Sequence, residues 1–296
     1  MFRIGAINDE LSPDLVRGLD LACELGVKDI EIHAVGEQSI EEIDDRTVEE
    51  LQQLLAERGL RVCNVSSTAF LRCHLKDSPE VIQWKGSFRT TFGSYKDHLR
   101  YLQRALDIAR TLDAPMVRVF AFWREGPTTD QVYDLAAERL QPAVDLAEKA
   151  GIPLVVENCP HTYFDWGSRA VQLVEMVNSP WLKLLWDPCT GVRSGEEDIL
   201  SAYPRIIRQV AHVHAKDLRF EPENGRPHRY VPIGEGVVPW EQILSLLAKD
   251  GYEGAVVLET HHLAPDGTKE TAARAMHAGL SRIAQRISVE AKGQKP

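Results

Sequence analysis

The sequence predicts an α/β fold, a single (β/α)8 barrel (TIM barrel) formed by residues 1–288 and followed by a polar C-terminal tail over residues 289–296. Short apolar segments alternate with amphipathic segments along the chain, which indicates strands followed by helices. The length of 296 residues suits one barrel, which typically takes about 250. Four of the later apolar segments end at metal-ligand residue types, namely Glu157, Asp187, His214 and Glu259.

The expected strands are short apolar runs bounded by glycine, proline or polar turn residues. The fifth of them, Leu154-Val-Val-Glu157 after Gly-Ile-Pro, has the continuous apolar character of a strand buried on both faces. Eight such segments occur, at residues 2–7, 27–32, 60–65, 114–120, 151–157, 182–187, 210–217 and 254–259. Eight strands are the number that a closed barrel of this kind requires.

The expected helices show apolar residues at helical spacing, and several of them end at a glycine. The first is expected to begin with Ser12 as its N-cap and Pro13 at its first position. The helical segments are residues 12–26, 44–58, 95–112, 129–150, 168–177, 196–203, 240–249 and 270–287. Residues 66–94, with little clear period, predict a loop over the strand ends or a short extra helix, and residues 217–238 predict a long loop or a hairpin.

Composition excludes several classes of function. A net charge of -10 and a pI near 5.5 argue against a nucleic-acid partner, which would require a clustered positive face. No apolar run approaches the roughly 18 residues that could span a bilayer, so we expect no membrane partner. The five cysteines lack a disulfide spacing and no signal peptide is seen, which indicates the reducing cytoplasm.

A parallel barrel brings the C-terminal ends of its strands together at one rim, where barrel enzymes carry out their chemistry. We therefore expect Glu157, Asp187, His214 and Glu259 to converge on one cation. Three carboxylates and one imidazole suit Mn²⁺, Mg²⁺ or Co²⁺, and the histidine also admits Zn²⁺. The alternative is that each acidic residue only caps the helix that follows its strand.

Several short motifs accompany these residues in order along the chain. They are Glu157-Asn158, Asp187-Pro188, His212-Val-His214-Ala-Lys216-Asp217, Gly234-Glu235-Gly236, and Gly251-Tyr252-Glu253-Gly254 before Glu259. Together they resemble the sugar phosphate isomerase/epimerase family of xylose isomerase-like barrels, over most of the chain and most strongly from Gly151 onward. The resemblance implies a divalent metal held by the four residues above and an α-hydroxycarbonyl sugar as substrate. In the ketose epimerases of this family the two glutamates move the proton, which implies catalytic roles for Glu157 and Glu259.

The chain departs from the sugar 3-epimerases at two positions. Those enzymes have a histidine three residues after the metal aspartate and an arginine six residues after the metal histidine, where this chain has Thr190 and Phe220. Arg219, Arg226 or Arg229 could substitute as an anchor for substrate oxygen or phosphate. The alternative is that these arginines are solvated surface residues.

Other residues near the strand ends are candidates for substrate binding. His161 could bind substrate or act as an acid, or it could be a structural histidine. Lys216 has the same strand phase as His214 and could stabilise an enediolate oxygen, or it could form a structural ion pair. Glu31 and His33 share one phase at the end of the second strand, where they could reach substrate or form a polar network in the core. His212 is expected to pack one layer deeper in the barrel.

The sequence thus favours an isomerase or epimerase that acts on a ketose or related sugar, free or phosphorylated, through an enediolate. A lyase is the alternative on the same metal site, because an enediolate beside a leaving hydroxyl loses water, as in inosose and dehydroshikimate dehydratases. An abasic-site endonuclease is disfavoured by Thr190 and the acidic charge, and a non-catalytic sugar-binding barrel by the complete ligand set. The expected partner is a small sugar or cyclitol, and a homo-oligomer stays open because such barrels often pair.

Overall fold

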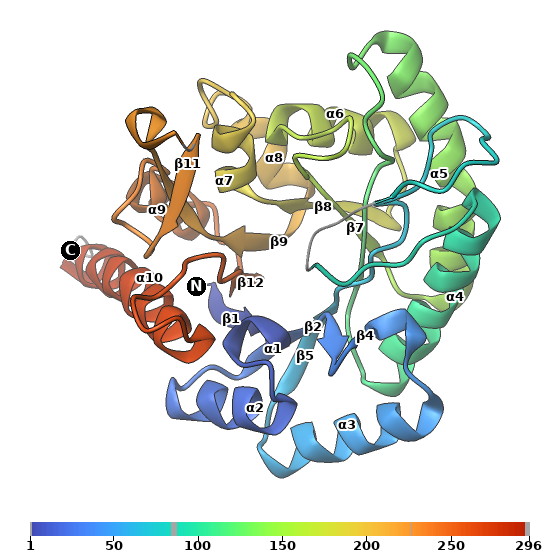
Figure 1. Ribbon diagram of the computed structural model, residues 1–296. Helices are drawn as coiled ribbons and strands as arrows, with labels where there is room; N and C mark the ends of the chain where they lie inside the picture. Colours follow the sequence, from blue (N-terminus) through green and yellow to red (C-terminus); the bar gives the residue numbers. More distant parts are fainter. Residues whose placement is uncertain (1, 84–87, 226, 294–296) are drawn as a thin grey trace.

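The computed structural model of the protein describes residues 2–83, 88–225 and 227–293. Eight parallel strands close into a barrel in the order β1-β2-β5-β6-β7-β8-β9-β12 (Figure 1). Their bounds are β1 Arg3–Ile7, β2 Asp29–Ile32, β5 Arg61–Val65, β6 Val117–Val119, β7 Leu154–Glu157, β8 Leu182–Trp186, β9 Val210–Ala215 and β12 Ala255–Leu258. The predicted (β/α)8 barrel is confirmed. Arg226, one of the candidate anchors, lies outside the described residues.

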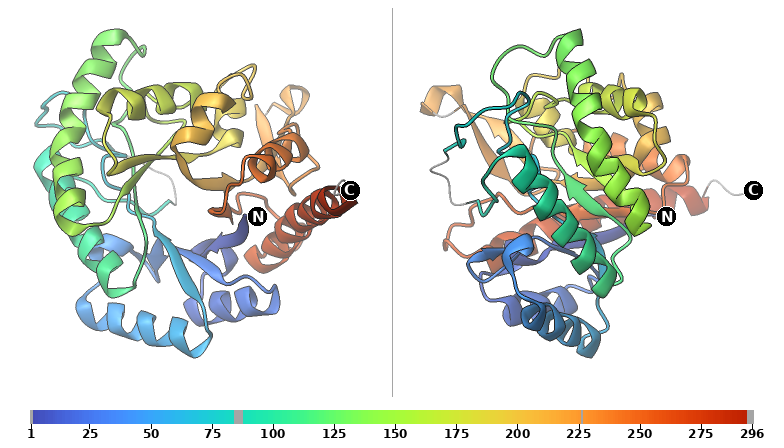
Figure 2. Two further views of the ribbon diagram at one scale, coloured as in Figure 1. Left: turned by 180° about the vertical axis from the view of Figure 1, so that it is seen from behind. Right: turned by 90° about the vertical axis from the view of Figure 1, so that its right-hand side faces the viewer.

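Helices surround the strands on the outside of the barrel (Figures 1 and 2). They are α1 Asn8–Leu11, α2 Leu15–Glu24, α3 Asp45–Glu57, α4 Tyr95–Thr111, α5 Asp130–Ala150, α6 Gly167–Val177, α7 Pro188–Arg193, α8 Tyr203–Gln209, α9 Trp240–Lys249 and α10 Lys269–Gly293. Most begin and end close to the predicted positions, because N-caps and glycines mark their ends. The capping box of Ser94 and Asp97, for example, begins α4.

Two predicted helix positions are wrong. Asp14, whose side chain accepts a hydrogen bond from the Arg17 amide, is the N-cap of α2, so Ser12 and Pro13 lie before the helix. Residues 196–202 form turns instead of a helix. The Glu196 carboxylate is committed elsewhere, because it accepts hydrogen bonds from the amides of Gly167 and Ser168 at the start of α6. The helical turns lie on either side, in α7 and α8.

The end of the chain is more ordered than its polarity predicts. The folded domain was expected to end at residue 288 and to continue as a polar tail, yet α10 runs through Gly293. Residues 289–293 read Val-Glu-Ala-Lys-Gly, and alanine, glutamate and lysine favour helix. The helix therefore continues into the segment that was predicted as a tail.

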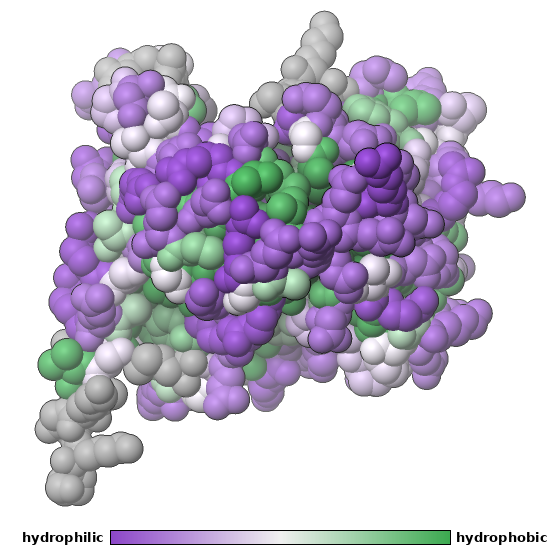
Figure 3. All heavy atoms as spheres, turned by 90° about the horizontal axis from the view of Figure 1, so that it is seen from below, coloured by the Kyte–Doolittle hydropathy of each residue, from purple (hydrophilic) through white to green (hydrophobic). Residues whose placement is uncertain are grey.

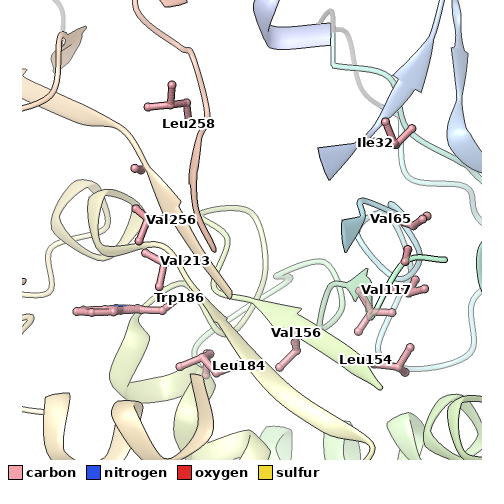
Figure 4. Close-up of a cluster of buried hydrophobic side chains, with 14 of the residues drawn as sticks. Ile32, Val65, Val117, Leu154, Val156, Leu184, Trp186, Val213, Val256 and Leu258 are labelled. Atoms are coloured by element: carbon pink, nitrogen blue, oxygen red, sulfur yellow. The ribbon is translucent and has the colours of Figure 1, made fainter. Parts of the chain in front are cut away.

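Alternate positions of each strand face opposite sides of the barrel wall. One set packs against the helices in the main apolar core, and Figure 4 shows strand residues of this set, including Val156, Trp186 and Val213. The other set faces the barrel interior. At one end of the interior, Ile7, Cys63, Ala255 and Val257 form a separate apolar cluster. Towards the C-terminal ends of the strands the interior becomes polar, which is where the candidate site lies.

Two long segments extend beyond the regular elements. The described part of residues 66–94 contains neither helix nor strand, and so forms the predicted loop. Residues 217–238 contain the hairpin of β10 Asp217–Phe220 and β11 His228–Val231. The buried Asp217 carboxylate accepts hydrogen bonds from the amides of Leu218, Gly234, Gly236 and Val238. A Cβ atom on Gly236 would lie 2.0 Å from that carboxylate, so the motif requires glycine there.

The surface is mainly hydrophilic on the face seen in Figure 3, with smaller apolar patches between the polar residues. Within the described ranges, no helix combines the length and the apolar character needed to cross a bilayer. All five cysteines are free thiols, and four of them are buried. The fold therefore depends on its packed core and hydrogen bonds, without disulfides.

Candidate metal centre and its cavity

The strand ends bring the four predicted ligands to one point inside the rim of the barrel. Glu157 ends β7, His214 belongs to β9, and Asp187 and Glu259 directly follow β8 and β12. One ligand atom from each residue can be chosen so that all of them lie within 4.8 Å of one another. All four residues are buried. We call these residues the ligand group: Glu157, Asp187, His214 and Glu259.

Asn158 and Thr190 fix the position of Asp187. The Asn158 side chain accepts a hydrogen bond from the Asp187 amide at 2.7 Å and donates one to the Asp187 carbonyl at 2.8 Å. Thr190 binds both carboxylate oxygens, through its amide at 2.9 Å and its hydroxyl at 2.7 Å. The threonine that replaces the histidine of the 3-epimerases thus holds Asp187. Asp187 also caps α7, so the helix-cap alternative holds for this residue alongside its place in the ligand group.

Glu31 lies behind His214, fully buried and away from the cavity. Its carboxylate lies 3.0 Å from Nε2 of His214 and 2.6 Å from Nε2 of His212. Nδ1 of His214 lies 3.5 Å from Glu157 and 3.3 Å from Glu259, and makes no hydrogen bond to a described residue. A carboxylate that binds the outer nitrogen of a histidine fixes its tautomer and directs the other nitrogen at the metal. Glu31 therefore belongs to the polar network that was the alternative to substrate binding.

Arg118 is the buried cation that the sequence reading missed. It belongs to β6 between Val117 and Val119, and its Nη1 donates to Oε2 of Glu157 at 3.0 Å. The same guanidinium donates hydrogen bonds to the carbonyls of Ser66 and Ser67. These bonds fix its position beside Glu157. The signal that could have revealed it is an arginine at the inward phase of a buried strand.

Lys216 occupies the position of a cation between two acidic ligands. Its Nζ lies 2.5 Å from Oδ2 of Asp187 and 2.5 Å from Oε2 of Glu259. Burial disfavours the ammonium form, but these two carboxylates raise the pKa of Lys216 well above its ordinary value. The buried ammonium thus neutralises part of the negative charge of the ligand group.

Both candidate catalytic carboxylates are held in the ionised form. Burial opposes ionisation of Glu157, but the charges of Arg118 and His214 outweigh it and lower its pKa. For Glu259, burial is likewise outweighed by Lys216 and His261, which hold the pKa well below the usual range. Each carboxylate can therefore accept a proton at neutral pH, as a general base must.

A cavity of about 520 Å³ opens onto the ligand group. Glu157, Glu259, His33, His161 and Lys216 line it, and with Glu31 just beneath they are the predicted site residues that the structure brings together. His33 contacts Asp9 at 3.1 Å and stacks on Phe88 at a centroid distance of 4.6 Å.

Arg219 does not reach this cavity. It is exposed on β10, and its Nε donates to the Glu235 carbonyl at 2.5 Å. Phe220, which replaces the family arginine, is 51% exposed. Arg229 pairs with Glu221 on the outer part of the hairpin. Neither arginine occupies the position of the missing anchor.

Apolar, aromatic and further polar residues complete the lining of the cavity. Leu71, Phe120 and Cys159 form one apolar cluster with Phe88, and Trp123 stacks on His161 at 5.5 Å. Thr190, Arg193 and Tyr230 add polar groups, from α7 and from β11. A second cavity, of about 530 Å³, lies at the opposite end of the barrel beside Arg3, Asp29 and Arg61 and contacts none of the ligand group.

Comparison with known proteins agrees with this architecture. Residues 19–279 match the sequence profile of the family described as the xylose isomerase-like TIM barrel. The chain belongs to this family. The resemblance inferred from the motifs is thereby confirmed, and the matched segment contains every member of the ligand group.

Several known proteins are similar to nearly the whole chain. The chain is 23% identical over 288 residues to L-ribulose-5-phosphate 3-epimerase UlaE of Salmonella heidelberg (strain SL476), covering 93% of this chain and 92% of that protein. The IOLI protein, solved with a bound zinc atom, has 17% identity and a TM-score of 0.75, covering 97% of this chain and 99% of that chain. A xylose isomerase-like TIM barrel protein from Mycobacterium smegmatis, solved in complex with magnesium, has 20% identity and a TM-score of 0.68. The match covers 97% of this chain and 98% of that chain.

Proposed function

We propose that this protein is a divalent-metal-dependent isomerase or epimerase that acts on a ketose or related sugar, free or phosphorylated, through an enediolate. The observation that carries the proposal is the ligand group itself, three carboxylates and a histidine nitrogen within 4.8 Å of one another at the rim of the barrel. The name of its relative UlaE, a sugar phosphate 3-epimerase, supports the same class of reaction.

The residues present fit a divalent cation. Three carboxylates supply hard oxygen ligands, and Nδ1 of His214, buried and without a hydrogen bond to any described residue, supplies the nitrogen. This set suits Mn²⁺, Mg²⁺ or Co²⁺ and admits Zn²⁺. When bound, such a cation would polarise the substrate carbonyl and so lower the energy of the enediolate.

Glu157 and Glu259 would carry the proton. Glu157 ends β7 and Glu259 follows β12, and these strands are separated in the barrel by β8 and β9, so the two carboxylates approach the cavity from different sides. One carboxylate removes the proton beside the carbonyl, and the other returns a proton to the opposite face, which inverts that carbon. Lys216 contacts Glu259 and lines the cavity, so its ammonium can donate a hydrogen bond to the oxygen that becomes negative.

A dehydratase is the second candidate, and the contact between Lys216 and Glu259 favours it. A carboxylate that removes the proton beside the carbonyl stands next to an ammonium that can protonate a departing hydroxyl on the neighbouring carbon. Water would then leave, and a double bond would form between the two carbons. The substrates would be of the inosose or dehydroshikimate type.

Incubation of the manganese-loaded protein with ketoses, ketose phosphates and cyclic polyhydroxy ketones in deuterated water tests both candidates. An epimerase gives an isomer that differs from the substrate only by exchanged deuterium, whereas a dehydratase gives a product lighter by one water. Glu157→Gln should strongly reduce either reaction, because Glu157 is a proposed metal ligand for both and a proton carrier for the epimerase. Turnover that persists unchanged in this variant would exclude the proposed proton transfer.

A further inference from the structure

Arg193 differs from the other basic residues of the cavity in forming no ion pair with a carboxylate of the described residues. The cavity is lined by the basic residues Arg89, Arg118, Arg193, Lys216 and Lys269. Four of these contact an acidic side chain, at distances from 2.5 to 3.8 Å. Arg193 is the exception, since its Nη1 donates to the Tyr230 hydroxyl at 3.1 Å and no carboxylate of the described residues forms an ion pair with it.

The helix α7 separates the backbone of Arg193 from that of Asp187 in the ligand group. Arg193 is the last residue of α7, and Asp187 is the N-cap of the same helix. A helix rises about 1.5 Å per residue, so the six residues of α7 separate the two ends by about 9 Å. Thr190, between them, also lines the cavity. A group bound by Arg193 would therefore lie several bonds away from substrate atoms at the ligand group.

The surroundings of Arg193 keep this end of the cavity positive. Burial, together with the charges of Arg193, Arg124 and Arg72, lowers the pKa of His161 to about 4, so this imidazole is neutral at pH 7. Arg124 is balanced by Asp165 at 2.7 Å. Arg193, which lines the cavity, is thus one source of the positive charge beside His161.

We propose that Arg193 binds a carboxylate or phosphate group of the substrate, at the end away from the ligand group. A guanidinium binds either oxyanion through paired, charge-assisted hydrogen bonds, and it replaces the anchor that Arg219 and Phe220 do not supply. The substrate is then an acidic or phosphorylated polyhydroxy ketone, and a neutral sugar should bind more weakly. The inference rests on the proposed function, which supplies the polyhydroxy ketone part of the substrate. It adds the anionic group at the other end.

Calorimetric binding to the manganese-loaded protein tests this without requiring turnover. Two matched pairs of probes are used, namely ribulose 5-phosphate with ribulose, and shikimate with its methyl ester. The variants are Arg193→Gln, Arg193→Lys and Arg208→Gln. Arg208 is exposed on the neighbouring helix α8, so its variant removes the same charge outside the cavity.

We expect the charged member of at least one pair to bind about 10- to 100-fold more tightly than its neutral partner. Arg193→Gln should remove this difference, Arg193→Lys should keep part of it, and Arg208→Gln should keep all of it. The pair that shows the difference identifies the group as phosphate or carboxylate. Equal binding of charged and neutral members, a preference that survives in Arg193→Gln, or no binding of any charged probe would overturn the inference.

The two proposals can fail separately. If the protein binds no metal but keeps an Arg193-dependent preference for an anion, the proposed function is wrong and the anion site stands. If the loaded protein epimerises neutral ketoses as well as their phosphates, the function stands and the role of Arg193 is wrong.

Discussion

The ammonium nitrogen of Lys216 lies 2.5 Å from a carboxylate oxygen of Glu259. The same nitrogen lies 2.5 Å from Asp187, on a second strand end of the barrel. One buried lysine thus neutralises two carboxylates that the proposed function assigns to a metal. Metal binding and the position of Lys216 should therefore be coupled.

Lys216→Met should lower the folding stability of the metal-free protein and increase the stabilisation that metal binding provides. Removal of one partner of a buried ion pair costs about 3–5 kcal/mol, because the remaining charges stay uncompensated. A divalent cation would restore the balance without having to displace the ammonium. We expect the variant to have a lower Tm in chelator and a larger rise in Tm on addition of manganese than the unmodified protein.

The control for this experiment is Lys249→Met, which removes an exposed lysine at the end of α9. Its response to manganese should match that of the unmodified protein. If Lys216→Met gains no more from manganese than this control, Lys216 does not share its carboxylates with a metal.

Glu31→Gln should weaken metal binding although Glu31 is not a proposed ligand. The Glu31 carboxylate contacts Nε2 of His214 and so directs Nδ1 towards the other ligands. Loss of such a partner typically lowers metal affinity by about 10- to 100-fold. Manganese titration followed by calorimetry measures the effect. Glu41→Gln is a matched control, because Glu41 is a buried carboxylate that contacts Ser67 and Thr68, and its variant should bind manganese normally.

His98 should make the stability of the fold depend on pH. Its Nδ1 accepts from the Phe70 amide and its Nε2 donates to the Arg72 carbonyl, both in the interior. Burial lowers the pKa of His98 to about 4. In the unfolded chain its pKa is near the ordinary 6.5, so between these values the unfolded state binds more protons. Stability therefore falls as the pH is lowered from about 6.5 towards 4, by up to about 3 kcal/mol.

Urea unfolding between pH 7 and pH 4.5 checks the contribution of His98. His98→Gln keeps one acceptor and one donor but does not titrate, so its unfolding free energy should decline less with acid than that of the unmodified protein. Parallel pH profiles for the two proteins would show that His98 does not cause the acid sensitivity.

Glu157→Gln and Glu259→Gln should each reduce epimerisation by about 10²- to 10⁴-fold, the range expected for loss of a general acid or base. Because two carboxylates share the proton transfer, one variant should still exchange the substrate proton with deuterated water while forming no epimer. Mass spectrometry of recovered substrate measures this exchange. Manganese content must be measured alongside, since both residues are also proposed ligands, and equal loss of exchange in fully loaded variants would contradict the division of roles.

The barrel and its ligand group could be predicted because both depend on strands, whose pattern is local. Each apolar run ends at its own ligand, and closure of a parallel barrel then brings those ends together. The convergence of Glu157, Asp187 and His214 could be predicted without knowledge of any loop conformation. The same period placed Glu31 inward, but it could not show that Glu31 lies behind His214.

The rest of the cavity depends on segments without such a pattern. Arg193 escaped prediction because α7 has only six residues and follows β8 directly, while a helix was expected eight residues farther along. Arg219 was placed near the substrate by its spacing from His214, but the chain leaves the barrel at Asp217 and pairs in the hairpin. In the sequence, Arg118 is a single polar residue within an apolar strand. Its contact with Glu157 forms only when the barrel brings β6 and β7 side by side.

The most direct test of the central claim is a manganese-soaked crystal examined by anomalous scattering. We predict one strong peak bounded by the side chains of Glu157, Asp187, Glu259 and Nδ1 of His214, with metal–ligand distances of about 2.0–2.3 Å. We also predict that the Lys216 ammonium has moved away from at least one of its carboxylates. A fully soaked crystal with no peak among these four residues, and with Lys216 still bridging Asp187 and Glu259, would contradict the assignment of this site as a metal centre.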